Sequence, residues 1–84
     1  MEKATWRPAG DRAAVVRLAG DGDAERARAL AGLADRLRRA KPPGLLEAVP
    51  GRETLTVYYD PLVLPWERLG EVLAAAVAGA GGDR

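Results

Sequence analysis

The chain has 84 residues, of which 48% are hydrophobic and 30% are charged, and its formal net charge is +1. This length allows one domain with a thin core, and the balanced charge excludes both intrinsic disorder and nucleic-acid binding driven by bulk charge. Cysteine and histidine are absent, which excludes a disulfide framework and the usual zinc sites, so we predict no metal and no cofactor.

The sequence shows no targeting or membrane signal. The N-terminal stretch MEKATWRPAGD is polar and lacks the apolar centre of a secretory signal. The longest apolar run, VLAAAVAGAG, is too short to span a bilayer. We therefore predict one cytoplasmic domain over residues 1–84, with no membrane contact, an ordered part over about 6–78 and a flexible tail over 79–84.

The first predicted element is a strand over residues 13–19, AAVVRLA, which ends at the Gly-Asp-Gly turn. In a strand, successive side chains point to opposite faces of the sheet. One face then carries Ala14, Val16 and Leu18, and the other carries Val15 and Arg17.

A helix is predicted next, from Asp23 to about Lys41. Apolar residues recur there at helical spacing, including Leu30 and Leu37. Asp23 is the expected N-cap, and basic residues crowd the last turns, where they suit the helix dipole. Pro42-Pro43-Gly44 ends the helix, because proline has no backbone N–H to donate.

The second half of the chain predicts a hairpin and another helix. Strands over Leu45–Val49 and Thr54–Tyr59 flank the short connector 50–53, and Asp60-Pro61 stops the second strand. Pro65 suits the first position of a helix whose apolar stripe runs until Gly79.

The resulting order is β-α-β-β-α, which is most of a split β-α-β unit. We therefore predict an α+β fold, a two-layer sandwich of ferredoxin-like order in which the closing strand after the second helix is absent. Two alternatives are open: the segment around Trp6-Arg7 supplies an extra strand, or the sheet keeps an open edge. Whether residues 3–8 form a strand stays undecided at this point.

Two helices can cover only one face of such a sheet, so the other face is predicted to be an interaction surface. Strict alternation gives this face the residues Val15, Arg17, Leu45, Glu47, Val49, Thr54, Thr56 and Tyr58. From them we select Val15, Arg17, Leu45, Val49 and Tyr58 as candidate protein-binding residues. Tyr58 is the preferred contact residue, and packing against a missing strand or tail is the alternative for it.

Four other features each have a functional and a structural interpretation. Gly20-Asp21-Gly22-Asp23 resembles part of a calcium loop but lacks the later ligands, so we favour a turn with a helix cap. Gly10-Asp11-Arg12 is either a small polar site or, as we favour, a turn. The cluster Arg36, Arg38, Arg39 and Lys41 either grips phosphate or, more commonly, forms a solvated helix face. Trp66 is expected to anchor the core rather than to bind a ligand.

No nucleophile–base pair can be assembled from this composition. Serine is absent together with histidine and cysteine, and the carboxylates fall mainly at caps and on exposed helix faces. General acid–base or covalent catalysis needs such groups at close spacing. We therefore predict no catalytic residues and no catalysis by this chain alone.

Three motifs occur in order along the chain: Gly10-Asp11-Arg12-Ala13 before the first strand, the Pro-Gly-aliphatic run at 43–50, and the Leu-x-Val-x-Tyr-Asp-Pro run at 55–61. Together they resemble the N-terminal domain of the KipI family, which is also known as allophanate hydrolase subunit 1 and includes a component of 5-oxoprolinase. The resemblance covers roughly residues 6–78. Members of this family usually carry a larger cyclophilin-like domain after this one, and that domain holds much of their substrate or partner surface.

The resemblance implies a bacterial protein-binding or regulatory module, and it leaves the partner open. Some members pair with a KipA-like subunit in ATP-dependent 5-oxoproline cleavage, and others are domains of urea carboxylase-type enzymes. KipI itself inhibits a histidine kinase. We therefore expect a KipA-like subunit, a carboxylase or a histidine kinase as partner. The alternatives are a subunit whose active site is completed at an interface, and a structural homodimer.

Overall fold

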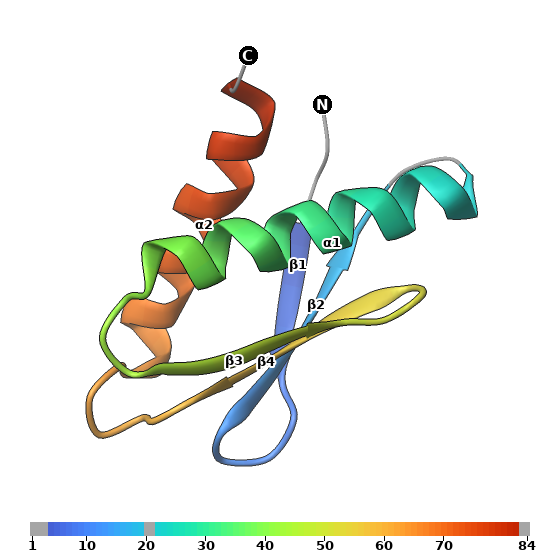
Figure 1. Cartoon of the computed structure of the whole chain (residues 1–84). Helices are drawn as coiled ribbons and strands as arrows, with labels where there is room; N and C mark the ends of the chain where they lie inside the picture. Colours follow the sequence, from blue (N-terminus) through green and yellow to red (C-terminus); the bar gives the residue numbers. More distant parts are fainter. Residues whose placement is uncertain (1–3, 20–21, 83–84) are drawn as a thin grey trace.

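Four strands and two helices follow one another along the chain in the order β-β-α-β-β-α (Figure 1). The computed structural model describes residues 4–19 and 22–82. The elements are β1 (Ala4–Pro8), β2 (Ala13–Leu18), α1 (Asp23–Ala40), β3 (Leu45–Pro50), β4 (Thr54–Tyr59) and α2 (Trp66–Gly82). Neither helix, within the described residues, combines the length and hydrophobicity needed to cross a membrane.

The strands form one antiparallel sheet in the order β1-β2-β4-β3. β2 and β3, which α1 connects, lie on either side of β4, as in a split β-α-β unit. β1 occupies the edge beside β2, so the segment around Trp6-Arg7 does supply an extra strand. The predicted α+β sandwich is confirmed, and the question of residues 3–8 is answered for Ala4–Pro8.

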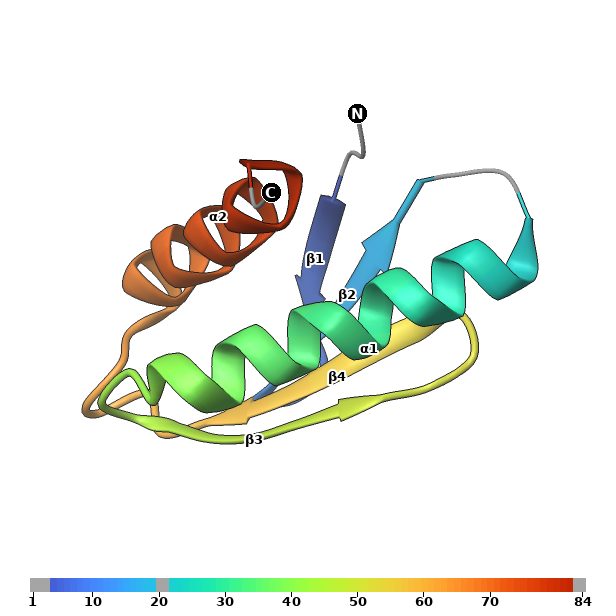
Figure 2. The same ribbon diagram turned by 45° about the horizontal axis from the view of Figure 1, so that its top comes forward.

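Both helices cover the same face of the sheet, and the core lies between these two layers (Figures 1 and 2). The alternation predicted for β2 is confirmed, because Val16 is fully buried while Arg17 is exposed. β4 alternates in the same way, with Leu55 and Val57 fully buried. The largest fully buried side chains are Leu30, Leu33, Leu37, Leu55, Leu69, Leu73, Val16 and Val57.

Helix α1 begins differently from the prediction. Gly22, with φ 85°, is the N-cap residue and makes no side-chain cap bond. Asp23 lies inside the first turn, where its carboxylate accepts a 3.0 Å hydrogen bond from Arg26. The predicted Asp23 cap was therefore wrong, because the helix starts one residue earlier than the cap assignment requires. At the other end Lys41 adopts a left-handed conformation, and its backbone N–H bonds to the Leu37 carbonyl.

Helix α2 starts after Pro65 and completes the helical layer that α1 begins. The Leu69 N–H bonds to the Pro65 carbonyl at 2.8 Å, so Pro65 precedes the helix and is not its first residue. The helix continues to Gly82, three residues beyond the predicted end at Gly79. Near its start it packs on β1: a Cβ added at Gly70 would lie 3.6 Å from the Trp6 indole nitrogen.

Candidate protein-binding surface

The face of the sheet opposite the helices is organised in rows that cross the strands. Val15 on β2 pairs with Thr56 on β4, and Thr56 pairs in turn with Val49 on β3. In the next row Tyr58 lies between Ala13 and Glu47. Because paired residues share a face, the candidates Val15, Val49 and Tyr58 meet on one continuous surface.

This surface is apolar at its centre and charged at its flanks. The exposed fraction is 45% for Val49 and 44% for Tyr58, and Val15 is half-buried between neighbouring side chains. Arg17 is exposed on the β2 side, and Glu47 is exposed on the β3 side. An apolar centre with a charged rim is the usual composition of a protein-docking surface.

Leu45 does not lie on this face, and its selection as a surface residue was wrong. It pairs with Tyr59 and packs against the core on the helix side. The reason is a β-bulge between Leu45 and Glu47, where Leu46 is an extra residue that shifts the alternation by one position. Leu46 is exposed instead, with 62% of its surface accessible.

Two further exposed apolar residues lie in the loop that joins β4 to α2. The exposed fractions of Leu62 and Val63 are 92% and 56%, whereas Leu64 beside them is buried. The turn is tight, because the Asp60 carboxylate accepts the Leu62 N–H at 3.0 Å and the Asp60 carbonyl accepts the Leu64 N–H at 2.8 Å. This pair was missing from the residues predicted from the sequence, although a Leu-Val dipeptide just after Pro61 was a usable signal.

Among residues 4–19 and 22–82, five large hydrophobic residues are exposed. They come from β3, β4 and the following loop, and they are Leu46, Val49, Tyr58, Leu62 and Val63. Scattered single apolar residues are ordinary on a protein surface, whereas a group from adjoining segments indicates an interaction site.

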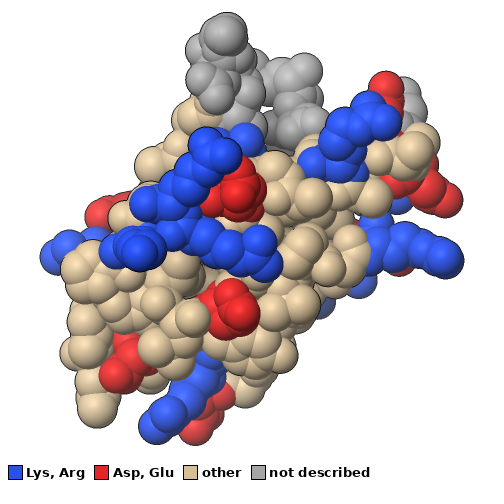
Figure 3. Space-filling model, in the orientation of Figure 1, with Lys and Arg blue, Asp and Glu red and all other residues tan. Residues whose placement is uncertain are grey.

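The arginine cluster at the end of α1 is engaged in contacts within the chain. Arg36 donates to the Ala76 carbonyl of α2 at 3.1 Å, and Arg38 donates to the Ala48 carbonyl of β3 at 2.7 Å. Arg39 forms a 2.9 Å ion pair with Asp35. In Figure 3 acidic groups lie among the basic ones on this side. These contacts favour the structural interpretation of the cluster over phosphate binding.

The remaining sequence candidates are also structural where the structure describes them. Gly10 has a positive φ of 84° in the β1–β2 turn, and the carbonyl of Arg12 accepts the Tyr59 N–H at 2.9 Å. The Trp66 ring packs against the core at 6.4 Å from the Tyr59 ring, which confirms its role as an anchor. Of the suspected calcium loop, Gly20 and Asp21 lie outside the described residues.

Over residues 4–19 and 22–82 no group of three or more potential ligands lies close enough to hold a metal ion. The buried residues of this part of the chain are all hydrophobic, so it contains no buried charged pair of the kind that acid–base chemistry uses. The fold and the surface define a class of protein: a small α+β sandwich domain whose uncovered sheet face carries exposed apolar residues among charged and polar ones.

Sequence comparison then identifies the family. The chain belongs to the carboxyltransferase domain family, subdomains C and D, whose model matches residues 4–83. This match and the structural neighbours support the predicted relationship to KipI and allophanate hydrolase subunit 1. No curated protein sequence matches the chain closely enough to add to this assignment.

Three solved structures illustrate the relationship. The chain is 22% identical to Kluyveromyces lactis urea carboxylase (TM-score 0.81), and the match covers 89% of this chain and 7% of that one. It is 21% identical to the N-terminal domain of the histidine kinase inhibitor KipI from Bacillus subtilis (TM-score 0.74), covering 99% and 96%. It is 31% identical to a conserved uncharacterised protein of Pyrococcus horikoshii (TM-score 0.67), covering 88% and 34%. The chain therefore spans a small part of the carboxylase and about a third of the Pyrococcus protein.

Proposed function

We propose that this domain is a non-catalytic, cytoplasmic protein-binding module of the KipI family, and that it docks its partner on the uncovered sheet face. The observation that supports the proposal is the exposure of Val49 and Tyr58 in adjacent rows of the uncovered face. An exposed aromatic residue such as Tyr58, set among aliphatic neighbours, is the type of residue that dominates binding energy at protein interfaces. The retained binding residues are Val15, Arg17, Val49 and Tyr58.

A second function is favoured by the family assignment itself. The match to a carboxyltransferase family and the likeness to a urea carboxylase indicate that such domains occur within multi-domain enzymes. In this alternative the chain is a subunit of a 5-oxoprolinase or carboxylase-type complex, with a KipA-like protein as its partner. The same sheet face then forms a subunit interface, and turnover requires both proteins.

Photo-cross-linking at Tyr58 tests the proposed surface directly. A photoreactive phenylalanine analogue replaces Tyr58 in the full chain, and the matched control carries it at Arg28, which is exposed on α1. We expect cross-linking to one defined protein from position 58 and none from position 28. A histidine kinase in the product would support a regulatory role, and a KipA-like or carboxylase subunit would support the enzyme-complex alternative.

Two other outcomes would change the assignment. A product that contains only a second copy of the chain would show that the face closes on itself in a structural homodimer. Equal cross-linking from positions 58 and 28, or none from either, would contradict a partner site on the sheet face. In a separate pull-down with the tagged chain, Tyr58→Ala should weaken capture of the partner while leaving the circular dichroism spectrum unchanged.

A further inference from the structure

The two edges of the sheet differ in their capacity to accept another strand. β1 and β3 are the edge strands, and an edge strand normally presents a row of unpaired backbone N–H and C=O groups. Those groups are the site at which an extended peptide adds to a sheet. The residues whose groups point outward can be found from the hydrogen bonds at the ends of each ladder, because inward and outward groups alternate along an antiparallel strand.

On β3 the outward groups belong to Ala48 and Pro50. The Gly51 N–H bonds to the Thr54 carbonyl at 2.7 Å, which makes this pair a hydrogen-bonded one. Inward-pointing residues recur at every second position, so Val49 and Glu47, two and four residues before Gly51, also direct their backbone groups toward β4. Ala48 and Pro50 therefore direct theirs away from the sheet.

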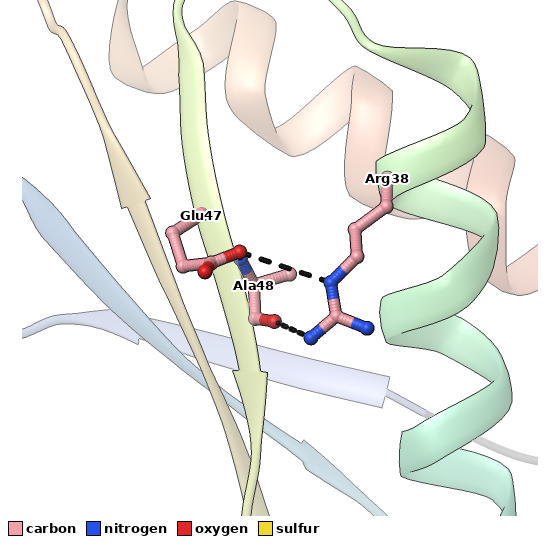
Figure 4. A network of polar contacts seen from close by, with 3 residues as sticks. All are labelled: Arg38, Glu47 and Ala48. Atoms are coloured by element: carbon pink, nitrogen blue, oxygen red, sulfur yellow. Dashed lines mark hydrogen bonds and ion pairs between the residues drawn. The ribbon is translucent and has the colours of Figure 1, made fainter.

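This edge is closed by side chains of the same chain (Figure 4). The Ala48 carbonyl accepts a 2.7 Å hydrogen bond from Arg38, and the Ala48 N–H donates a 3.0 Å bond to the Glu47 carboxylate. Arg38 also lies 3.7 Å from that carboxylate, which holds both side chains in place. Pro50 has no N–H to offer, and the bulge at Leu46 disturbs the register further. A strand cannot add here without displacing Arg38 and Glu47.

On β1 the outward groups are free of such contacts. The Ala9 N–H bonds to the Ala13 carbonyl at 2.8 Å, so Arg7 and Thr5, two and four residues earlier, direct their groups toward β2. The backbone groups of Ala4, Trp6 and Pro8 therefore point outward, and Pro8 offers a carbonyl but no N–H, so the N–H donors of this edge are those of Ala4 and Trp6. Among the described residues no side chain hydrogen-bonds to these groups.

The side chains along β1 define what can bind there. Arg7 is exposed on the uncovered face, as is Arg17 on the neighbouring strand, and neither forms an ion pair with another described residue. Trp6 lies on the helix side, where it is half-buried against the core and α2. An added strand would place one set of alternate side chains opposite Arg7 and the other beside Trp6.

We infer that the β1 edge binds an extended segment of a partner protein in which acidic and apolar residues alternate, and that this segment becomes a fifth strand. Its acidic residues meet Arg7 at a non-hydrogen-bonded pair, where cross-strand side chains approach most closely. Its apolar residues cover Trp6. A second copy of this chain fits less well, because two-fold pairing of β1 with β1 brings the Arg7 side chains onto the same face. This site binds its ligand through the β1 backbone edge and adjoins the sheet-face site at Arg7 and Arg17.

The test uses the full chain and a synthetic peptide of alternating glutamate and valine. One control peptide carries lysine in place of glutamate, and another is N-methylated on the edge that must pair with β1. Amide hydrogen exchange is measured residue by residue by NMR. In the free protein the Thr5 and Arg7 amides should exchange slowly and the Trp6 amide quickly, because only the latter points outward.

We expect the glutamate peptide in large excess to slow exchange at Trp6 by about tenfold or more, with little change at Thr5 and Arg7. The lysine peptide and the N-methylated peptide should have no such effect. Arg7→Glu should reverse the preference toward the lysine peptide, while Arg28→Glu on α1 should not. The inference is overturned by unchanged Trp6 exchange in a millimolar excess of peptide, by equal protection from the N-methylated peptide, or by protection confined to β3 or β4. Any of these results leaves the Tyr58 cross-linking test unaffected.

Discussion

Gly44 is the glycine with the least room for a side chain in the described part of this fold. Its φ is +92°, and a Cβ placed there would lie 2.6 Å from the Leu64 Cβ and 3.0 Å from the Leu64 backbone nitrogen. Its carbonyl also accepts the Asp60 N–H at 2.8 Å. The residue therefore holds the start of β3 against the loop that carries Leu62 and Val63.

Gly44→Ala should destabilise the domain by about 2–4 kcal/mol, because a left-handed backbone cost is added to an overpacked contact. The matched control is Gly10→Ala. Gly10 has a similar φ of +84° but no atom within 4 Å of the added Cβ, so only the backbone cost of about 1 kcal/mol applies. Urea unfolding of both variants measures the difference. Equal losses of stability would show that the loop moves away from Gly44 without cost.

At the scale of the elements, Arg38 of α1 protects the β3 edge of the sheet. Its hydrogen bond to Ala48 keeps the β3 edge closed. Arg38→Ala should cost about 1 kcal/mol of unfolding free energy, since one neutral carbonyl loses a charged donor. It should also produce concentration-dependent association, because an outward backbone acceptor becomes available for strand pairing.

Arg39→Ala is the control for this prediction. Arg39 is a neighbouring arginine that forms the exposed ion pair with Asp35, which contributes no more than about 0.5 kcal/mol. Light scattering over a dilution series, together with urea unfolding, compares the two variants. If Arg38→Ala stays monomeric at every concentration, the edge is protected by the bulge and Pro50 alone. If both variants associate equally, the effect arises from lost surface charge.

The same elements show what the sequence could and could not reveal. The two central strands were predictable, because one face of each is buried and hydrophobic alternation then determines the orientation of every side chain. β3 is an edge strand with a bulge, and a single extra residue reversed the orientation of Leu45 without leaving a signal in the apolar pattern. The roles of Arg36 and Arg38 were also out of reach, since their acceptors are backbone carbonyls 40 and 10 residues away.

For the molecule as a whole, the main departure from a ferredoxin-like chain is the edge strand beside β2, because it comes from the N-terminal part of the sequence. In the complete split β-α-β arrangement a strand that follows α2 would lie beside β2 and close the sheet. Here β1 occupies that position from the opposite end of the sequence. This strand stayed undecided at the level of sequence because the segment is short and contains proline. The assignment of β1 as a strand depends on its pairing with β2, and the residues of the segment itself do not indicate that pairing.

A circular permutation tests whether β1 replaces the closing strand. The end of α2 and the start of β1 lie on the same side of the molecule (Figures 1 and 2). A flexible linker of about ten residues, with a mean span of about 17 Å, is placed between Gly82 and Ala4. The new ends fall between Gly10 and Asp11 in the exposed β1–β2 turn.

The permuted chain has the order β-α-β-β-α-β and should fold to the same sheet. We expect its unfolding free energy to stay within about 2 kcal/mol of the parent, because all packing contacts are retained and only loop closure changes. NMR contacts between Trp6 and Val16, which pair across β1 and β2, would report correct placement of the moved strand. As a control, a chain cut at the same turn without the linker lacks β1 and should expose Val16 and lose stability. A permuted chain that resembled this truncated form would show that β1 must precede β2 for the sheet to assemble, and that it is more than a substitute for the closing strand.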